Sequence, residues 1–157
     1  MYIFFGVHKM QIQPLRKEYL ESFLKLAEEN ESFFGPMVDS PDFIKSYYAT
    51  CRNQSGYCII NESEQVVAAI IVSRKRNEID WLAVSNKNKG RGYGKLLLKK
   101  AIDELSDDKI KLLTFADEYK EGVPARNLYK QFGFTDVKGM GLNPAGYDIV
   151  LMERIPI

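Results

Sequence analysis

A glycine-rich turn between a short apolar strand and an amphipathic helix constrains the fold of this chain more than any other feature. The strand is Trp81–Val84, the turn contains Gly90, Gly92 and Gly94, and the helix begins near Lys95. Glycine permits a positive φ and lets the backbone approach a ligand closely. The first N–H groups of a helix lack partners within the helix and lie at its positive end. Strand, turn and helix together predict a cradle for the phosphates of a ligand.

The spacing of the glycines excludes two common nucleotide motifs. A Walker A loop has four residues between its glycines and a hydroxyl after its lysine, whereas three residues separate Gly90 from Gly94 and Leu96 replaces the hydroxyl. A dinucleotide fingerprint has two residues before its third glycine, and here that glycine comes one residue early and in mid-chain. The predicted anion is therefore neither an ATP phosphate of the Walker type nor a dinucleotide pyrophosphate.

The segment Lys89–Gly94 resembles motif A of the GNAT superfamily of acetyl-CoA-dependent N-acetyltransferases, with Lys89 in place of the usual Gln or Arg. The resemblance implies acetyl-CoA as co-substrate, with its pyrophosphate held by backbone N–H groups and its pantetheine along the preceding strand. The cofactor-binding residues that it implies are Leu82, Ala83, Val84, Lys89, Gly90, Arg91, Gly92, Tyr93, Gly94 and Lys95. A strand–helix turn without any ligand is the alternative interpretation.

A second segment, Ala125–Phe134, resembles motif B of the same superfamily, in which Leu-Tyr is followed three residues later by Gly-Phe. The resemblance implies that Tyr129 is the general acid that protonates the leaving thiolate. The alternative is a core aromatic ring with its hydroxyl at the edge. The family often has an Asn seven residues before this tyrosine, and Gly122 stands there instead. A cofactor contact from the loop 117–123 is therefore not carried over.

Two carboxylates precede the apolar strand and are candidates for the base. Strand alternation predicts that Glu78, Asp80, Leu82 and Val84 share one face. The segments Arg91–Gly94 and Leu113–Asp117 resemble the histone-acetylating branch of the superfamily. This resemblance implies that Glu78 acts as base through water, with Asp80 in reserve. The alternative is a pair of solvated carboxylates beside a water chain that needs no dedicated base.

Composition narrows the class of protein. A chain of 157 residues with 45% apolar residues and a net charge of +1 suits one globular domain, residues 1–157, with residues 1–9 as a candidate extension. This charge gives no electrostatic argument for binding nucleic acid or an anionic membrane. The longest apolar run, Val66–Val72, is too short to span a bilayer.

The start lacks a basic region and a cleavage site, so a cytoplasmic location with Cys51 and Cys58 as free thiols is expected. With His8 as the single histidine, no Cys/His metal site is expected.

Periodicity along the chain predicts an α/β fold with helices on both faces of a mixed sheet. Ser40 and Pro41 are placed to begin a helix whose buried face includes Tyr47 and Tyr48. The order β-α-α-β-β-β-α-β-α-β-β is the GNAT order. Its segments are 10–13, 16–29, 41–51, 57–60, 66–73, 78–84, 95–105, 110–116, 124–132, 134–137 and 147–152.

The resemblance implies transfer of an acetyl group from acetyl-CoA to a primary amine of a small molecule or peptide. The alternative is a GNAT-fold module that binds acyl-CoA as a sensor without transfer, and the resemblance also leaves a homodimer open. We expect the acceptor site to form from the loop between the first two helices and the last hairpin. Carboxylates and aromatic rings gather in that loop, which suits a cationic amine, although an acidic solvated helix end would look the same. These residues are Glu28, Glu29, Glu31, Phe33, Phe34, Asp39 and, on the next helix, Tyr47.

Overall fold

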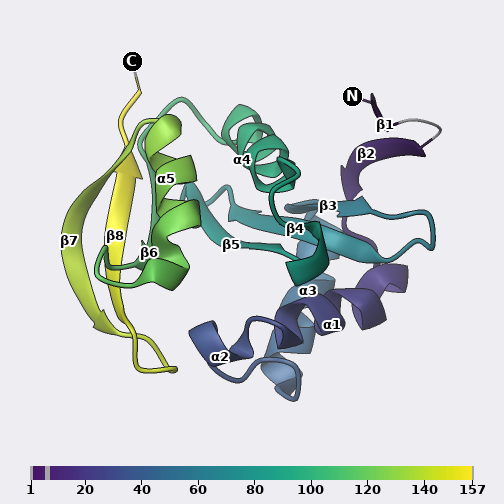
Figure 1. Cartoon of the computed structure of the whole chain (residues 1–157), viewed down its shortest axis with the longest axis horizontal. Coiled ribbons are helices and arrows are strands. Elements are labelled where there is room, and N and C mark those ends of the chain that lie inside the picture. Colours follow the sequence, from purple (N-terminus) through teal and green to yellow (C-terminus); the bar gives the residue numbers. More distant parts are fainter. Residues whose placement is uncertain (1, 6–7, 157) are drawn as a thin grey trace.

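A computed structural model describes residues 2–5 and 8–156, with side chains from residue 11 onward. Its strands form an eight-stranded mixed sheet in the order β1-β2-β3-β4-β5-β6-β8-β7 (Figure 1). The strands are β1 Tyr2–Phe5, β2 His8–Pro14, β3 Gly56–Ile60, β4 Val66–Ser73, β5 Glu78–Val84, β6 Ile110–Phe115, β7 Phe134–Leu142 and β8 Asp148–Arg154. The helices are α1 Leu20–Glu28, α2 Glu31–Phe34, α3 Pro41–Asn53, α4 Tyr93–Glu104 and α5 Val123–Gln131, with 3-10 turns at Lys17–Tyr19, Asn86–Asn88 and Lys120–Gly122.

The predicted order of elements is confirmed, and two elements are added to it. Strand β1 lies within the candidate extension and pairs with β2 in antiparallel register, Tyr2 opposite Gln11. Helix α2 occupies part of the predicted connection between the segments 16–29 and 41–51. The predicted start of α3 is confirmed, because the hydroxyl of Ser40 accepts from the N–H of Phe43 at 3.3 Å and Pro41 follows it.

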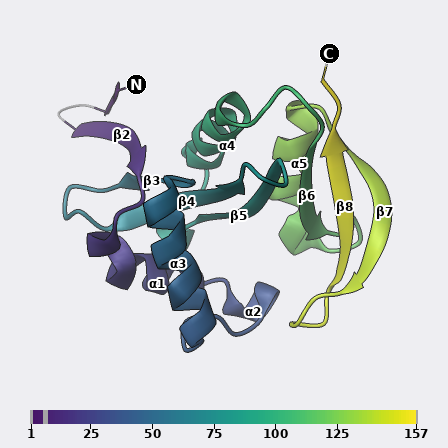
Figure 2. The same cartoon turned by 180° about the vertical axis from the view of Figure 1, so that it is seen from behind.

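Helices cover both faces of the sheet and produce two hydrophobic cores. Helices α4 and α5 pack on one face, and α1 and α3 pack on the other (Figures 1 and 2). Side chains of the central strands alternate between them, so that Ile59 and Ala68 join the first core while Cys58 and Ala69 join the second. Strand β4 is buried on both faces, as its continuous apolar run predicts.

The surfaces of two helices test the predicted periodicity. On α4 two ion pairs have the i,i+4 spacing of a helix surface, Lys99 with Asp103 at 3.6 Å and Lys100 with Glu104 at 2.9 Å. On α3 the prediction for Tyr48 is wrong, because its side chain is exposed and Thr50 is buried instead. The helix is rotated so that Tyr47 alone, of the two tyrosines, packs against Phe23 of α1.

The sheet opens between its two parallel strands. Strands β5 and β6 pair only through Glu78 with Lys111 and Ile79 with Leu112. Beyond these pairs β6 continues beside β8 as far as Phe115, while β5 remains paired with β4 as far as Val84. The carboxyl half of β5 therefore has one open edge, and the glycine turn follows directly from it.

Within residues 2–5 and 8–156, no helix combines the length and apolarity needed to cross a bilayer.

Candidate active site

The glycine turn presents unpaired N–H groups to open space. Gly90 and Gly92 adopt positive φ angles of 79° and 81°, and a Cβ atom built on either would meet no protein atom within 4 Å. Gly92 is the N-cap of α4, and no side chain caps the helix. Within the described part of the chain, the N–H groups of Tyr93, Gly94 and Lys95 have no hydrogen-bond acceptor. Unpaired donors at the positive end of a helix of 12 residues form a site that fits a pyrophosphate.

Gly94 has a different role from the two preceding glycines. A Cβ atom at this position would lie 3.3 Å from Cδ2 of Leu128 and 3.8 Å from Cγ2 of Val84. Its missing side chain therefore lets α4 approach α5 and the end of β5. This close approach brings the glycine turn and the helix that carries Tyr129 to the same end of the sheet.

The side chains around the turn divide into two groups. The ring of Tyr93 is buried in the core beneath α4, so only the backbone of this predicted cofactor-binding residue is available to a ligand. Lys89, Arg91 and Lys95 are exposed, and none of them forms an ion pair with another residue that the structure describes. These three cations are free to contribute to the binding of an anionic ligand.

The open edge of β5 carries two of the three predicted main-chain partners. The N–H of Ser85 donates to the carbonyl of Val67 on β4 at 2.8 Å. In an antiparallel pair, alternate residues direct their N–H and C=O groups toward the partner strand. The N–H of Ala83 therefore points toward β4, whereas the N–H groups of Leu82 and Val84 point to the open edge. The prediction that Ala83 offers a free donor is wrong for this reason.

Tyr129 lies on the face of α5 that packs against the sheet. Its ring is buried and meets Phe134 edge-on at 6.0 Å, and burial raises the pKa of the phenol to about 12. Among the described side chains, the one fully enclosed polar atom without a hydrogen bond is Nε1 of Trp81. The hydroxyl of Tyr129 has no hydrogen-bond partner there either, and because it is not among the fully enclosed atoms it keeps access to solvent. Its raised pKa keeps it protonated at neutral pH. A buried ring with a free, protonated hydroxyl is what a general acid requires.

A β-bulge changes the predicted arrangement of the two carboxylates. The pairing of β4 with β5 steps from Ile71–Trp81 to Val72–Ile79, which leaves Asp80 as the extra residue. Leu82 and Val84 therefore face the core beneath α4, while Asp80 faces the side of α1 and α3. The prediction of one shared face is wrong, because a bulge interrupts the alternation on which it depended.

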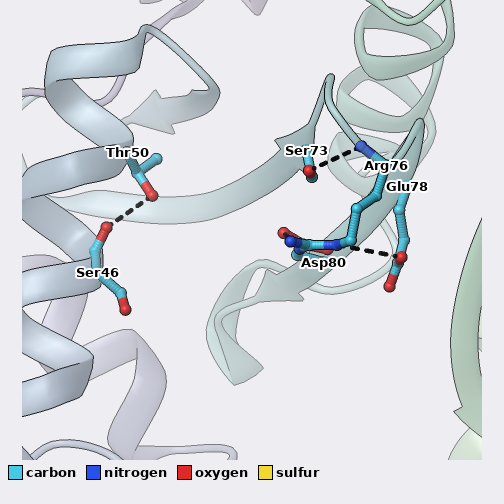
Figure 3. A network of polar contacts seen from close by, with 6 residues as sticks. All are labelled: Ser46, Thr50, Ser73, Arg76, Glu78 and Asp80. Carbon is cyan, nitrogen blue, oxygen red and sulfur yellow. Dashed lines mark hydrogen bonds and ion pairs between the residues drawn. The ribbon is translucent and has the colours of Figure 1, made fainter.

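Arg76 holds both carboxylates on the α1/α3 side. Its Nη2 lies 2.9 Å from Oδ2 of Asp80, and its Nε lies 3.5 Å from Oε2 of Glu78 (Figure 3). The Asp80 carboxylate raises the pKa of the guanidinium, chiefly through this hydrogen bond. The role of Arg76 has no signal in the sequence, because the turn at residues 74–77 and the bulge together bring the three side chains into contact.

The loop after α1 and the last hairpin come together as predicted for an acceptor site. The side-chain amide of Asn143, in the hairpin between β7 and β8, donates to the carbonyl of Phe33 at 2.8 Å. The carboxylate of Glu31, however, accepts from the N–H groups of Met37 and Val38, which lower its pKa. This acidic side chain therefore stabilises the loop.

The structure also explains the departure at Gly122. A Cβ atom here would lie 2.8 Å from Cβ of Phe115. An asparagine would require the end of β6 to move, so this position offers no side-chain contact to a cofactor.

Comparison with known proteins agrees with this geometry. The model of the acetyltransferase (GNAT) family matches residues 16–134. A search of curated protein sequences gave no significant match. Among solved structures, a chain of the NatC complex bound to Gag peptide and CoA has 22% identity, a TM-score of 0.74 and coverage of 94% of this chain and 99% of that one.

Two bacterial structures have the same fold. An N-acetyltransferase from Staphylococcus aureus Mu50 has 14% identity and a TM-score of 0.74, with 93% of this chain and 98% of that chain covered. Ribosomal-protein-alanine N-acetyltransferase from Brucella melitensis has 15% identity and a TM-score of 0.72, with 92% and 99% covered. At these identities the likeness concerns the fold, whereas the family match spans both the glycine turn and Tyr129. The chain belongs to the acetyltransferase (GNAT) family and is an N-acetyltransferase.

Proposed function

We propose that the chain transfers the acetyl group of acetyl-CoA to a primary amine. The observation that carries the proposal is the continuity between two sets of unpaired main-chain donors. The N–H groups at the start of α4 suit the pyrophosphate, and those of Leu82 and Val84 on the open edge of β5 suit the pantetheine and the thioester. The NatC neighbour, which was solved with CoA bound, supports this assignment.

The protein must assist three steps of the reaction. The amine nitrogen must lose a proton, and Glu78 is the proposed acceptor of that proton through water. A carbon–nitrogen bond then forms at the thioester carbonyl while the carbon–sulfur bond breaks, and the N–H of Leu82 is the proposed donor to the carbonyl oxygen. The sulfur leaves with the proton of the Tyr129 hydroxyl, and the nitrogen releases its second proton to solvent as the amide forms, from which the hydroxyl is restored. The products are the N-acetylated amine and free CoA.

A screen of primary amines, read as release of the CoA thiol from acetyl-CoA, tests this proposal. We expect amine-dependent release of CoA by the wild-type protein and a large loss of that release for Tyr129→Phe. Binding of CoA with no release for any amine would instead support a sensor without transfer activity. An absence of CoA binding would contradict both functions.

A further inference from the structure

A small pocket lies beside the bulge on the α1/α3 side of the sheet. Its volume is about 250 Å³, and four aromatic side chains contribute to its walls: Phe23, Phe43, Tyr47 and Trp81. The ring of Phe23 lies 4.6 Å from that of Tyr47 and 4.9 Å from that of Trp81, measured between centroids. The hydroxyl of Tyr47 donates to the carbonyl of Arg16, so this residue presents its ring to the pocket as an apolar wall.

The charged residue that lines this pocket is Asp80. Ser46 and Thr50 of α3 lie across from it (Figure 3), and Thr50 donates its hydroxyl to the carbonyl of Ser46 at 2.9 Å. Aromatic walls with one carboxylate suit a cation that carries an apolar body, because rings attract the cation and the carboxylate neutralises it. The size of the pocket suits a small molecule.

The position of the pocket connects it to the proposed chemistry. Asp80 and Trp81 immediately precede Leu82, whose N–H points to the open edge of β5. Glu78, the proposed base, shares with Asp80 the ion pairs to Arg76. An ammonium group beside Asp80 would therefore lie near both the base and the thioester site.

A cation of the protein already pairs with Asp80, although it does not line the pocket. The guanidinium of Arg76 is 2.9 Å from Asp80, and its side chain is 58% exposed, against 30% for Asp80. An exposed ion pair of this kind is weak and can exchange partners. The Arg76 side chain would therefore compete with an incoming cation for the Asp80 carboxylate.

We propose that this pocket is the acceptor subsite, and that it takes a small primary amine with an alkyl or aryl body, whose ammonium displaces Arg76 from Asp80. The inference rests on the proposed acetyl transfer and adds the class of acceptor to it. It assigns Asp80 to recognition of the ammonium and leaves removal of the proton to Glu78.

Trp81 is the single tryptophan of the chain, so its fluorescence reports directly on the pocket. The experiment titrates phenethylamine into the wild-type protein with CoA present, and 2-phenylethanol serves as the neutral probe of the same shape. We expect a saturable change with the amine and at least about tenfold weaker binding of the alcohol. Equal binding of the two probes, or no saturable change with the amine, would overturn the proposal.

Three substitutions locate the effect. Asp80→Asn is expected to weaken amine binding by about tenfold or more, since a charge-assisted hydrogen bond is lost. Arg76→Gln is expected to strengthen it about threefold, because the competing cation is removed. The matched control Asp103→Asn, which lies in an exposed ion pair on α4, is expected to change affinity by less than about twofold. Unchanged affinity in Asp80→Asn would overturn the assignment of this residue.

Filling the pocket provides a test that does not depend on charge. Ser46 is exposed on α3 and lines the pocket, so Ser46→Leu should fold and should weaken phenethylamine binding, whereas the neighbouring exposed Lys45→Leu should not. The amine screen separates the two proposals. Release of CoA with an amine whose KM is unaffected by Asp80→Asn and Ser46→Leu would overturn this subsite and leave acetyl transfer standing. Failure to bind CoA would overturn acetyl transfer itself.

Discussion

The guanidinium of Arg126 and the carboxylate of Asp136 lie 2.7 Å apart, and they tie α5 to β7. The Arg126 side chain is 4% exposed and that of Asp136 is 44% exposed, so the cation is enclosed while its partner reaches the surface. Arg126 also donates to the carbonyl of Phe115 at 3.1 Å, at the end of β6. Because Tyr129 follows one turn later on α5, this ion pair fixes the helix that carries the proposed acid.

Removal of Asp136 should therefore lower stability markedly. We expect Asp136→Ala to reduce the free energy of unfolding by about 2–3 kcal/mol, because it leaves a buried cation without its counterion. Asp103→Ala, which breaks an exposed pair with Lys99, should cost no more than about 0.5 kcal/mol. Urea unfolding of the two variants measures the difference, and equal costs would show that burial of Arg126 does not matter.

Loss of the Tyr129 hydroxyl should affect the rate and spare the fold. Tyr129→Phe keeps the buried ring, and the hydroxyl has no partner within the described residues, so the free energy of unfolding should change little. We expect kcat to fall about 100-fold, the lower range for a lost general acid, with little change in the KM for acetyl-CoA. Steady-state kinetics give both values. A kcat close to that of the wild type would remove this residue from the mechanism.

The same phenol should make the fold sensitive to alkaline pH. Burial raises the pKa of Tyr129 to about 12 in the folded protein, above its ordinary value of 10.0. The folded state thus holds the proton more tightly, and its stabilising contribution is complete below pH 10 and lost as the pH rises toward 12. Urea unfolding at pH 8 and pH 11 should show a smaller alkaline loss for Tyr129→Phe than for the wild type. Identical losses would mean that this phenol is not buried in the folded state.

Glu78 can be tested through pH, because a base matters only while the amine holds its proton. We expect Glu78→Gln to lower the rate about tenfold or more near pH 7. This deficit should shrink as the pH approaches the pKa of a free amine, about 10. Glu64→Gln, at an exposed turn between β3 and β4, is the control. A deficit that is constant across pH would point to a positioning role for Glu78.

Local features of the sequence predicted much of this site. The glycine turn, the start of α4 and the face of α5 depend on residues close together in the chain, and their conformations follow from glycine and from helical spacing. Gly90 and Gly92 adopt the positive φ angles expected of the turn. The fold class followed because the order of these elements is that of the family.

Features that depend on pairing between distant segments could not be predicted. The bulge at Asp80 is set by the register of β5 against β4, and one extra residue moved the carboxylate to the opposite side from Leu82. The contact of Arg76 with both carboxylates follows from that bulge. Strand β1 likewise depends on its partner β2, and its four residues have no local signal that separates a strand from a tail.

The unpaired N–H groups at the start of α4 are proposed to bind the pyrophosphate of CoA, and amide chemical shifts report this contact. Titration of CoA into 15N-labelled protein should produce saturable shifts of the amides of Tyr93, Gly94 and Lys95. Gly92→Ala should weaken binding at least about tenfold, because its methyl group would project into the open space at this turn, where the ligand is proposed to lie. Gly141→Ala, at a similar positive φ of 84° in open surroundings on β7, should bind CoA as the wild type does. CoA binding that leaves these three amides unshifted, or that is equal in the two variants, would show that the start of α4 does not hold the pyrophosphate.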